Sequence, residues 1–441
     1  MKNWEKKKLG DICGFVRGPF GGSLKKNIFK PEGYAVYEQQ HAIYDQFDDI
    51  RYFIDENKFN EMKRFELNSG DLIMSCSGTM GKIAIVPENI KKGIINQALL
   101  KLTPSKKIST VFLKLWMQSE SFQESLKEYS GGAAIQNVAS VAILKQIEIP
   151  LPPLPEQQRI VSILDEAFAA IAKAKANAEQ NLKNAKELFE SYLQGVFEKK
   201  GDGWEEKKLG EVCDIKHGYA FEGDDFETDF SGSNPIVLTP GNFTEDSKLS
   251  FTTKNTKRCK TEYPKDYLFS VGELVVVMTD LSSLMKILGK PAIIDRDDIL
   301  HNQRIGRFVF KEDSIEKSYL FYFLQTNKYL NKVKESATGT MVRHTAPKRI
   351  LNIEIQFPKS HKEQQTIVRQ LDALRAETQK LEAVYQKKIA DLEELKKSIL
   401  QKAFAGELRS PEGAAYDSEA ATPLAKKTPS SITSPEGASR L

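Results

Sequence analysis

The chain carries one sequence pattern twice, with the copies about 200 residues apart, and this duplication limits the folds open to it. The opening segment Trp4–Cys13 returns as Trp204–Cys213, with the tryptophan, the Leu-Gly pair and the cysteine in the same places. Further pairs follow in the same order: Gly70-Asp71-Leu72-Ile73 and Gly272-Glu273-Leu274-Val275, Asn96-Gln97 and Asn302-Gln303, and Glu156-Gln157-Gln158 and Glu363-Gln364-Gln365. A solenoid repeat is only roughly 20–50 residues long. Each copy is therefore predicted to be a globular domain followed by a helix, in a molecule with two related halves.

The composition is typical of a globular protein and only mildly basic. Of the 441 residues, 40% are hydrophobic and 28% charged, and the formal net charge is +4. This charge permits nucleic-acid binding without arguing for it, because Lys and Glu are mixed along the chain. Any strongly basic surface has to be local.

Cysteine, histidine and hydropathy patterns exclude several classes of protein. The four cysteines form no C-x-x-C pair and the five histidines have no ligand spacing, so no metal site is predicted. Cys13 and Cys213 stand at equivalent places and are expected to be small buried side chains. The absence of a disulfide framework and of a long apolar run predicts a cytoplasmic protein without membrane contact.

Two long segments follow a helical pattern. Small or apolar residues recur every three or four positions at Ile160, Leu164, Phe168, Ile171, Ala174, Ala178, Leu182, Ala185, Phe189, Tyr192 and Val196. The second copy repeats the spacing at Ile367, Leu371, Leu374, Thr378, Leu381, Tyr385, Lys388, Leu392, Leu395, Ile399 and Lys402. One exposed helix with a single apolar stripe is not stable alone, so the two are expected to pack as a coiled coil. Each helix follows its domain, which favours antiparallel pairing.

These patterns predict an α+β fold with two similar mixed α/β domains separated by two long helices in an antiparallel coiled coil. Short strands and Gly-rich turns are typical of the mixed domains, and a helix is expected over Thr110–Tyr129. The predicted organisation is a first domain over residues 1–154, a spacer helix over 155–200, a second domain over 201–358, a second spacer helix over 359–408 and a disordered tail over 409–441.

No catalytic motif emerges. Gly78-Thr79-Met80-Gly81-Lys82 superficially resembles a phosphate loop, but its glycines are too close together and Ile83 follows the lysine. The equivalent segment of the second copy, Thr279–Lys286, has no glycine at all. The chain is therefore predicted to have no active site and to act by binding.

Loops that occupy equivalent places but differ in sequence are the candidate binding elements. Gly14–Lys26 corresponds to Asp214–Gly223, and Gly131–Asn137 to Thr338–His344. Such divergence fits two domains that read different targets, and it equally fits ordinary drift after duplication.

Side chains of the kinds that read bases are Ser77, Thr79, Gln136, Asn137, Arg343 and His344. Candidate phosphate contacts, each of which could equally be a solvated surface charge, are Lys25, Lys26, Lys254, Lys257, Arg258 and Lys286. Basic and aromatic residues near the same loops complete the DNA-binding set: Arg17, Lys82, Lys216, His217 and Tyr219.

Over residues 1 to about 408 this layout resembles the specificity (S) subunit of type I restriction–modification enzymes. The resemblance is carried by the two Trp…Leu-Gly…Cys openings, the Gly70–Lys82 stretch and the segment Ile149–Gln158, in their duplicated order. It implies two target-recognition domains that each read half of an interrupted, asymmetric site in double-stranded DNA. It also implies that the helices set the gap and dock two modification (M) subunits.

The resemblance places all catalysis on other chains. The M subunits would bring S-adenosylmethionine, the restriction (R) subunits would bring ATP-driven cleavage, and no cofactor is expected here. The second copy departs from the pattern, because it lacks the Gly-Thr-x-Gly turn and has Phe357-Pro358-Lys359 in place of the proline-rich exit. The alternatives are a coiled-coil scaffold that binds polypeptides, the specificity subunit of another restriction system class, and, less favoured, an enzyme with catalysis on this chain.

Overall fold

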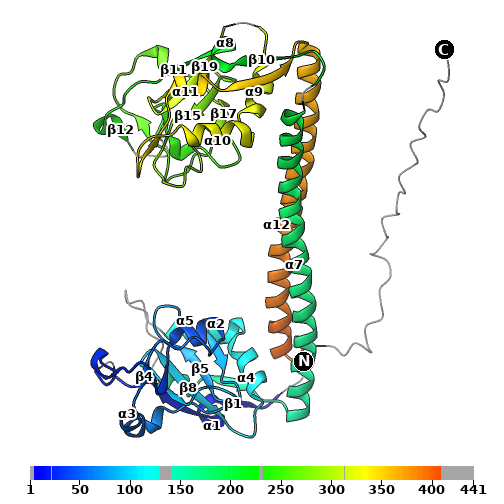
Figure 1. The fold of residues 1–441 in the computed structure, drawn as a ribbon. Coiled ribbons are helices and arrows are strands. Elements are labelled where there is room, and N and C mark those ends of the chain that lie inside the picture. Colours follow the sequence, from blue (N-terminus) through cyan, green and yellow to red (C-terminus); the bar gives the residue numbers. More distant parts are fainter. Residues whose placement is uncertain are drawn as a thin grey trace, which may run out of the picture. The chain divides into compact units, whose positions relative to one another are not determined.

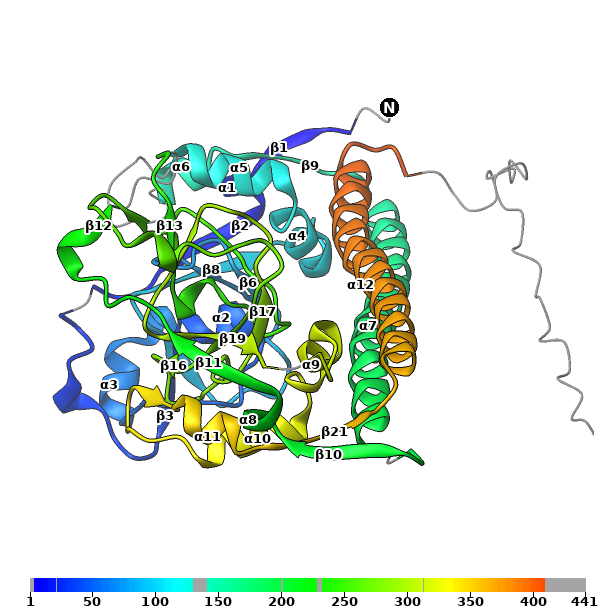
Figure 2. The same ribbon diagram turned by 90° about the horizontal axis from the view of Figure 1, so that it is seen from above.

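The computed structural model describes residues 4–20, 22–129, 141–199, 201–227, 232–311 and 313–408. It divides into two compact units, residues 1–174 with 391–441 and residues 175–390. Each unit contains a mixed α/β domain and parts of two long helices (Figure 1 and Figure 2). The predicted tail over 409–441 and the predicted base contacts Gln136 and Asn137 lie outside the described residues.

The first domain is built on an antiparallel four-stranded sheet, ordered β2-β8-β5-β6. A three-stranded sheet β4-β3-β7 and the pair β1-β9 complete it. Its strands are β1 (Lys6–Lys8), β2 (Cys13–Arg17), β3 (Tyr34–Tyr37), β4 (Phe53–Ile54), β5 (Leu72–Ser75), β6 (Ile83–Ile85), β7 (Gly93–Ile95), β8 (Leu99–Pro104) and β9 (Glu148–Pro150). Its helices are α1 (Leu9–Ile12), α2 (Gln39–Tyr44), α3 (Glu56–Glu61), α4 (Thr110–Met117), α5 (Glu120–Tyr129) and α6 (Val141–Leu144).

The second domain repeats this plan, with a four-stranded sheet ordered β11-β19-β15-β17. A second sheet β12-β14-β13-β18 and the pairs β10-β21 and β16-β20 complete it. Its strands are β10 (Trp204–Lys208), β11 (Cys213–His217), β12 (Phe226–Glu227), β13 (Ile236–Leu238), β14 (Arg258–Cys259), β15 (Leu274–Val277), β16 (Thr279–Asp280), β17 (Pro291–Ile293), β18 (Ile299–His301), β19 (Ile305–Phe310), β20 (Arg343–His344) and β21 (Glu354–Pro358). Its helices are α8 (Leu209–Val212), α9 (Lys317–Phe323), α10 (Asn327–Glu335) and α11 (Pro347–Leu351).

The central strands β5 and β15 explain why the sequence repeats an apolar run after Gly-Asp and Gly-Glu. Successive side chains of a strand point to opposite faces of the sheet. Leu72 and Met74 enter one apolar core and Ile73 enters another, so β5 is covered on both faces. In β15, Val276 and Val277 are divided between two cores in the same way. A strand buried on both sides needs a continuous apolar run rather than alternation.

The shared leucines and cysteines of the two opening segments, Trp4–Cys13 and Trp204–Cys213, contribute to the apolar cores. Leu9 and Leu209 are fully buried, as are the thiols of Cys13 and Cys213 nearby. Burial raises the pKa of both thiols to about 12, because a thiolate would lose its hydration there. The expectation of small buried cysteine side chains is confirmed.

The helix expected over Thr110–Tyr129 is divided into α4 and α5. α4 ends at Met117, and the Ser119 hydroxyl donates a hydrogen bond to the carbonyl oxygen of Trp116. This bond takes up a carbonyl at the end of α4 and lets the chain turn before α5. The 3–4 spacing of apolar residues continues through the break, which is why the sequence pattern did not reveal it.

The two long helices are α7 (Leu154–Glu198) and α12 (His361–Phe404), and within each unit they lie side by side (Figure 1 and Figure 2). In the first unit the Lys396 ammonium lies 4.9 Å from the ring centre of Phe168. In the second, the Arg375 guanidinium lies 5.4 Å from the ring of Phe189, and Tyr192 lies within 3.5 Å of Gln370. The early part of one helix therefore meets the late part of the other. The predicted antiparallel pairing and the predicted fold class are confirmed.

The predicted seam of α12 is partly wrong, because two of its positions lie one residue later. Ile389 and Ala403 turn inward where Lys388 and Lys402 were expected, and both lysines are exposed. Leu381 is also outside the seam, with 41% of its surface exposed. Both registers have the same average spacing of about 3.5 residues. The register is set by the partner helix, which sequence spacing alone does not reveal.

Candidate nucleic-acid interface

Two equivalent glycines hold the Gly-rich loops against the Asn-Gln turns. A Cβ on Gly18 would lie 1.8 Å from the carbonyl oxygen of Asn96, and one on Gly218 would lie 2.4 Å from that of Asn302. Each asparagine side chain accepts a backbone N–H two residues later, at 3.0 Å in both turns. The duplicated Gly and Asn-Gln residues thus form a tight junction at the start of each divergent loop. No larger side chain fits at either glycine.

The described candidate residues of the first domain lie on two segments around this junction. Lys25, Lys26, Thr79 and Lys82 are exposed, and Arg17 and Ser77 are half-buried. The turn before Lys82 is shaped by Ser75, whose hydroxyl donates to the Thr79 carbonyl at 2.6 Å and accepts from Lys82 N–H at 3.0 Å. The Ser77 hydroxyl lies 3.1 Å from the Gln39 amide oxygen.

Arg17 lies at the end of β2, beside the buried Cys76. Burial raises the pKa of the Cys76 thiol to about 11, although the neighbouring guanidinium favours the thiolate. Lys25 and Lys26 lie farther along the same loop. Arg17 is therefore held against the sheet, whereas the two lysines extend into solvent.

In the second domain the corresponding loop presents Lys216, His217 and Tyr219 at the surface. The Tyr219 backbone is tied to the Asn-Gln turn, since its N–H donates to the His301 carbonyl at 2.8 Å and its carbonyl accepts from Gln303 at 3.0 Å. The Tyr219 ring packs against Phe221 at 5.0 Å between ring centres. This aromatic side chain has a fixed backbone and a partly exposed ring.

The structure joins two predicted segments that are far apart in the sequence. Strands β16 and β20 pair, so that Thr279 lies opposite His344 and Asp280 opposite Arg343. The Thr279 hydroxyl lies 3.1 Å from Nδ1 of His344. Thr338 and His344 exchange two backbone hydrogen bonds of 2.9 Å, which close the 338–344 loop on itself. Both loops therefore form one rigid element.

Sequence reasoning missed Asp280, whose side chain stabilises the turn that follows β16. Its carboxylate is buried and accepts backbone N–H groups from Ser282 at 2.8 Å and Ile287 at 3.0 Å. Aspartate bonding to the backbone two residues ahead is a common turn motif, and the Asp-Leu-Ser order was the available signal.

The remaining basic candidates have different environments. Lys254, Lys257 and Lys286 are exposed; the Lys257 ammonium lies 5.0 Å from the Phe226 ring centre, and Lys286 pairs with Glu245 at 3.0 Å. Arg258 is buried, donates to the Asn234 carbonyl and lies 3.9 Å from Asp298. Arg258 holds β14 in place, so its guanidinium is not presented to a phosphate.

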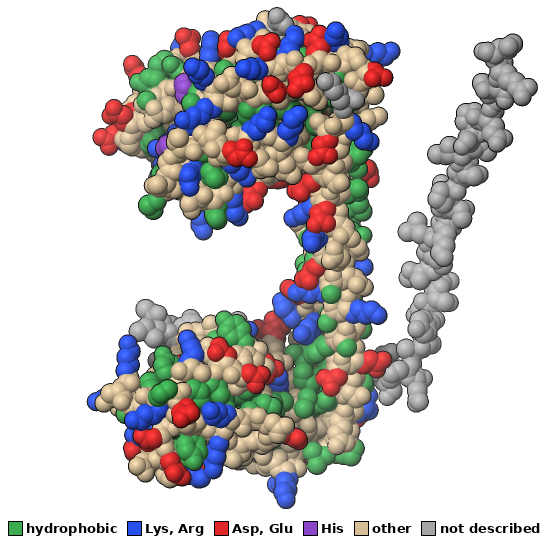
Figure 3. All heavy atoms as spheres, viewed as in Figure 1, with side chains coloured by type: hydrophobic (Ala, Val, Ile, Leu, Met, Phe, Trp, Pro, Cys, Tyr) green, Lys and Arg blue, Asp and Glu red, His purple; other side chains and the backbone are tan. Residues whose placement is uncertain are grey.

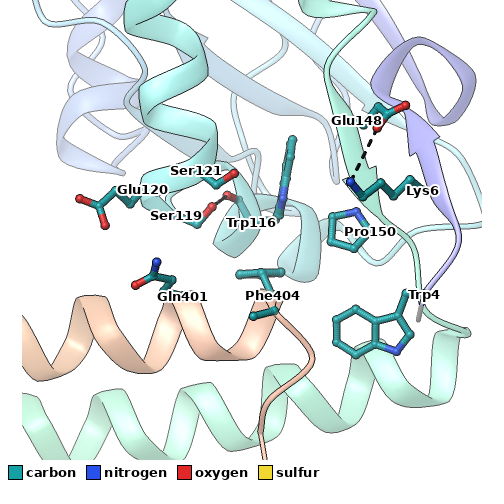
Figure 4. Close-up of a pocket in the computed structure, with 11 residues that line it drawn as sticks. Trp4, Lys6, Trp116, Ser119, Glu120, Ser121, Glu148, Pro150, Gln401 and Phe404 are labelled. Atoms are coloured by element: carbon teal, nitrogen blue, oxygen red, sulfur yellow. Dashed lines mark hydrogen bonds and ion pairs between the residues drawn. The ribbon is translucent and has the colours of Figure 1, made fainter. Parts of the chain in front are cut away.

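A cavity of about 400 Å³ in the first unit lies where β1 and β9 approach the end of α12 (Figure 4). Trp4, Trp116 and Phe404 give it aromatic walls, and Lys6 pairs with Glu148 at its edge at 3.9 Å. At the equivalent corner of the second unit, Trp204 donates to Glu363 at 3.1 Å and Phe197 packs against Tyr319 at 5.0 Å. The two corners are thus built from matching positions with different contacts.

The described residues include neither a metal-binding cluster nor a membrane-spanning helix. Among them, no three His, Cys, Asp or Glu side chains lie close enough together to hold a metal ion. None of their helices combines the length and the apolar character needed to cross a bilayer. Basic and acidic side chains are mixed over the face of each domain that Figure 3 shows.

The structure thus contains two domains with the same strand framework and different loops, each connected to a long helix. The chain belongs to the family of the type I restriction modification DNA specificity domain, whose family model matches residues 1–183 and 201–391. The predicted family resemblance is confirmed.

Individual relatives agree with this assignment over most of the chain. The type I restriction enzyme MjaVIII specificity subunit of Methanocaldococcus jannaschii is 28% identical over 92% of this chain and 93% of its own length. The EcoKI specificity subunit of Escherichia coli K12 is 23% identical over 70% of this chain and 67% of its own length.

Solved structures show the same fold. A chain from a structural study of complex assembly and conformational transition in the type I R-M system matches with a TM-score of 0.72, at 19% identity over 92% of this chain and 98% of its own length. The HsdS subunit from Thermoanaerobacter tengcongensis matches with a TM-score of 0.57, at 20% identity over 92% of this chain and 97% of that one.

Proposed function

We propose that this chain reads a DNA sequence in two parts, one with each domain, for a type I restriction–modification complex. The observation that carries the proposal is the shared strand order of β2-β8-β5-β6 and β11-β19-β15-β17, which hold loops of unlike sequence. Two copies of one strand framework that carry different loops suit two half-sites of different sequence. The expected target is therefore an interrupted, asymmetric site in double-stranded DNA.

Within each domain, loop side chains divide into base contacts and phosphate contacts. Ser77 and Thr79, with Gln136 and Asn137, are proposed to read bases in the first half-site, and Arg343 and His344 in the second. The exposed lysines position the duplex through its phosphates: Lys25, Lys26, Lys82, Lys216, Lys254, Lys257 and Lys286. Arg17, His217 and Tyr219 complete the contacts beside the two glycine junctions. Arg258 is not among the proposed contacts, because its guanidinium is buried and donates to the Asn234 carbonyl.

The chain itself is proposed to be non-catalytic and to act with partner subunits. Two M subunits would dock on the long helices and supply methyl transfer from S-adenosylmethionine, and R subunits would supply ATP-driven cleavage. Support for docking comes from apolar side chains that the helix pair leaves exposed, one turn apart, at Leu188 and Tyr192 of α7 and at Leu381 and Val384 of α12. Such exposed apolar positions are typical of interaction surfaces.

The length of the helices is proposed to set the gap between the half-sites. One heptad adds about 10 Å of helix, which equals about three base pairs of DNA. Inserting a heptad in α7 between Ala174 and Ala185, with a matching heptad in α12 between Thr378 and Ile389, should lengthen the gap. If a folded variant keeps the same gap, the spacing role of the helices is contradicted, while the proposal that the domains read DNA still stands.

The deciding experiment is to co-express the chain with the products of its neighbouring genes and map methylated adenines in the host DNA. Methylation at one interrupted motif is expected, and exchanging residues 1–150 for another domain of the family should change one half of that motif only. The unexchanged half is the internal control. If no motif appears and the purified complex ignores DNA at low salt, a polypeptide-binding scaffold replaces the proposal.

A further inference from the structure

The rigid element formed by β16 and β20 ends in a group of exposed apolar side chains. Leu281 and Leu284 follow β16, and Met341 and Val342 precede Arg343 of β20. Their exposed fractions are 60%, 70%, 79% and 37%, respectively. We call these four residues the apolar tip. Single exposed apolar residues are ordinary, but four of them on two loops joined by the β16–β20 pair call for an occupant.

The backbone holds the apolar tip in place. Gly339 has φ +96°, and a Cβ there would lie 2.0 Å from the Val342 carbonyl oxygen, so the loop is tightly closed. The Arg349 guanidinium donates to the Ser336 carbonyl at 2.6 Å at the base of the same loop. On the other side, Met285 adopts φ 49°, a left-handed conformation that costs energy for a residue with a side chain. The two loops are thus shaped to hold these side chains outward.

Basic groups flank the apolar tip on the same segments. Arg343 and His344 follow it directly, and Lys286, which pairs with Glu245 at 3.0 Å, follows Leu284 and Met285. A surface that combines apolar contacts with flanking cations matches the major groove of DNA, where phosphates border the base edges. The apolar group exposed in that groove is the C5-methyl of thymine.

We propose that the apolar tip recognises thymine through its C5-methyl group in the half-site bound by the second domain. The inference rests on the proposed DNA-reading function and adds the chemical group that is read. Arg343 and His344 would contact neighbouring base edges or phosphates, while the tip excludes water from the methyl group. Burial of the methyl group then favours thymine over uracil and cytosine at that position.

Uracil substitution tests this directly, because uracil differs from thymine only by the methyl group. After the methylated motif is known, duplexes carrying uracil at each thymine of the second half-site are titrated with the assembled complex, by fluorescence anisotropy. At one position or more, affinity is expected to fall about fourfold, the ratio expected for one buried methyl-sized group. Met341→Ser and Leu284→Ser should abolish this thymine-to-uracil ratio, so that each variant binds the thymine and uracil duplexes alike.

Val271→Ser is the matched control, because Val271 is 63% exposed in the same unit but outside the apolar tip. It should keep the thymine-to-uracil ratio.

The inference is overturned if uracil is tolerated everywhere in the second half-site, if that half-site contains no thymine, or if the tip variants weaken both duplexes equally. Tip variants that fail to assemble with partner subunits, but keep the ratio in the assembled fraction, would also overturn it and assign the tip to a protein contact. Failure of the unaltered complex to bind any specific DNA would instead overturn the proposed function.

Discussion

Gln157 and Gln364 occupy equivalent positions in the two copies and make the same three hydrogen bonds. Gln157 accepts the Ser109 N–H at 2.8 Å and donates to the carbonyls of Pro152 at 2.8 Å and Lys107 at 3.2 Å. Gln364 accepts the Glu316 N–H at 2.8 Å and donates to Pro358 at 2.8 Å and Ser314 at 3.0 Å. Both side chains are fully buried. Each amide thus ties the start of a long helix to the residues that precede α4 or α9.

Removing either amide should destabilise the junction between helix and domain. In Gln157→Ala or Gln364→Ala, one N–H and two carbonyl oxygens, one of them buried and the rest partly buried, lose their partner. We expect a cost of about 3 kcal/mol in unfolding free energy. Hydrogen exchange should report the loss of protection in α4 for the first variant and in α9 for the second. Gln158→Ala is the control, because the neighbouring Gln158 is exposed. Equal effects of Gln157→Ala and Gln158→Ala would contradict the assigned role.

Alanine should be tolerated at some glycines of the two Gly-rich loops and should disturb the structure at others. Gly18→Ala and Gly218→Ala place a Cβ against the backbone of the Asn-Gln turn, so the turn or the loop has to move. Overpacking of this kind typically costs about 1–3 kcal/mol. In the assembled complex each variant should disturb recognition of one half-site, read out by methylation mapping. Gly22→Ala and Gly223→Ala, where a Cβ meets nothing within 4 Å, should leave both half-sites unchanged.

His301 predicts a loss of stability at acidic pH. Its ring is fully buried, with Nε2 2.8 Å from the Ile305 carbonyl, and burial lowers the pKa to about 4. Below pH about 6.5 the unfolded chain binds a proton at this residue while the folded chain does not, so folding stability falls until the pH reaches the folded-state pKa. The contribution amounts to about 3 kcal/mol over that window.

The His301 effect can be measured in the full chain by hydrogen exchange in β18 and β19 between pH 7 and pH 4. His301→Gln, which keeps a donor for Ile305, should show a shallower decline than the unaltered chain. His361→Gln should act in the opposite direction, because the hydrogen bond to Glu316 raises the pKa of His361 and its stabilisation is present at low pH. An unchanged slope in His301→Gln would show that other groups govern the acid response.

The exposed lysines predict the salt dependence of DNA binding. Lys82→Gln and Lys254→Gln should each weaken binding to all sequences alike and reduce the slope of log K against log salt by about one. Lys380→Gln is the control, since Lys380 is exposed on α12 and pairs with Glu377 at 2.8 Å. If a variant changes the sequence preference but leaves the salt slope unchanged, its lysine contacts bases rather than phosphates.

The features that sequence predicted well are those that both copies need for the same physical reason. Buried cysteines and helix-starting Glu-Gln-Gln segments recur because each satisfies one local requirement in both domains. Pairing of β16 with β20 could not be predicted, because it joins residues more than 60 positions apart whose sequences carry no shared signal. Arg258 shows the same limit, since its burial depends on Asn234 and Asp298 rather than on its neighbours in sequence. The loops that differ between the two copies lack the repetition that made the rest of the chain predictable.

The continuous helices have a consequence for synthesis of the chain. The first unit joins residues 1–174 to residues from 391 onward, and Leu400 and Ala403 belong to the same apolar core as Leu9 and Phe112. The second unit is an uninterrupted stretch, residues 175–390. A ribosome therefore completes the second core before the first, although it makes the first domain earlier. The N-terminal domain has to wait, with part of its apolar surface uncovered, until the last turns of α12 emerge.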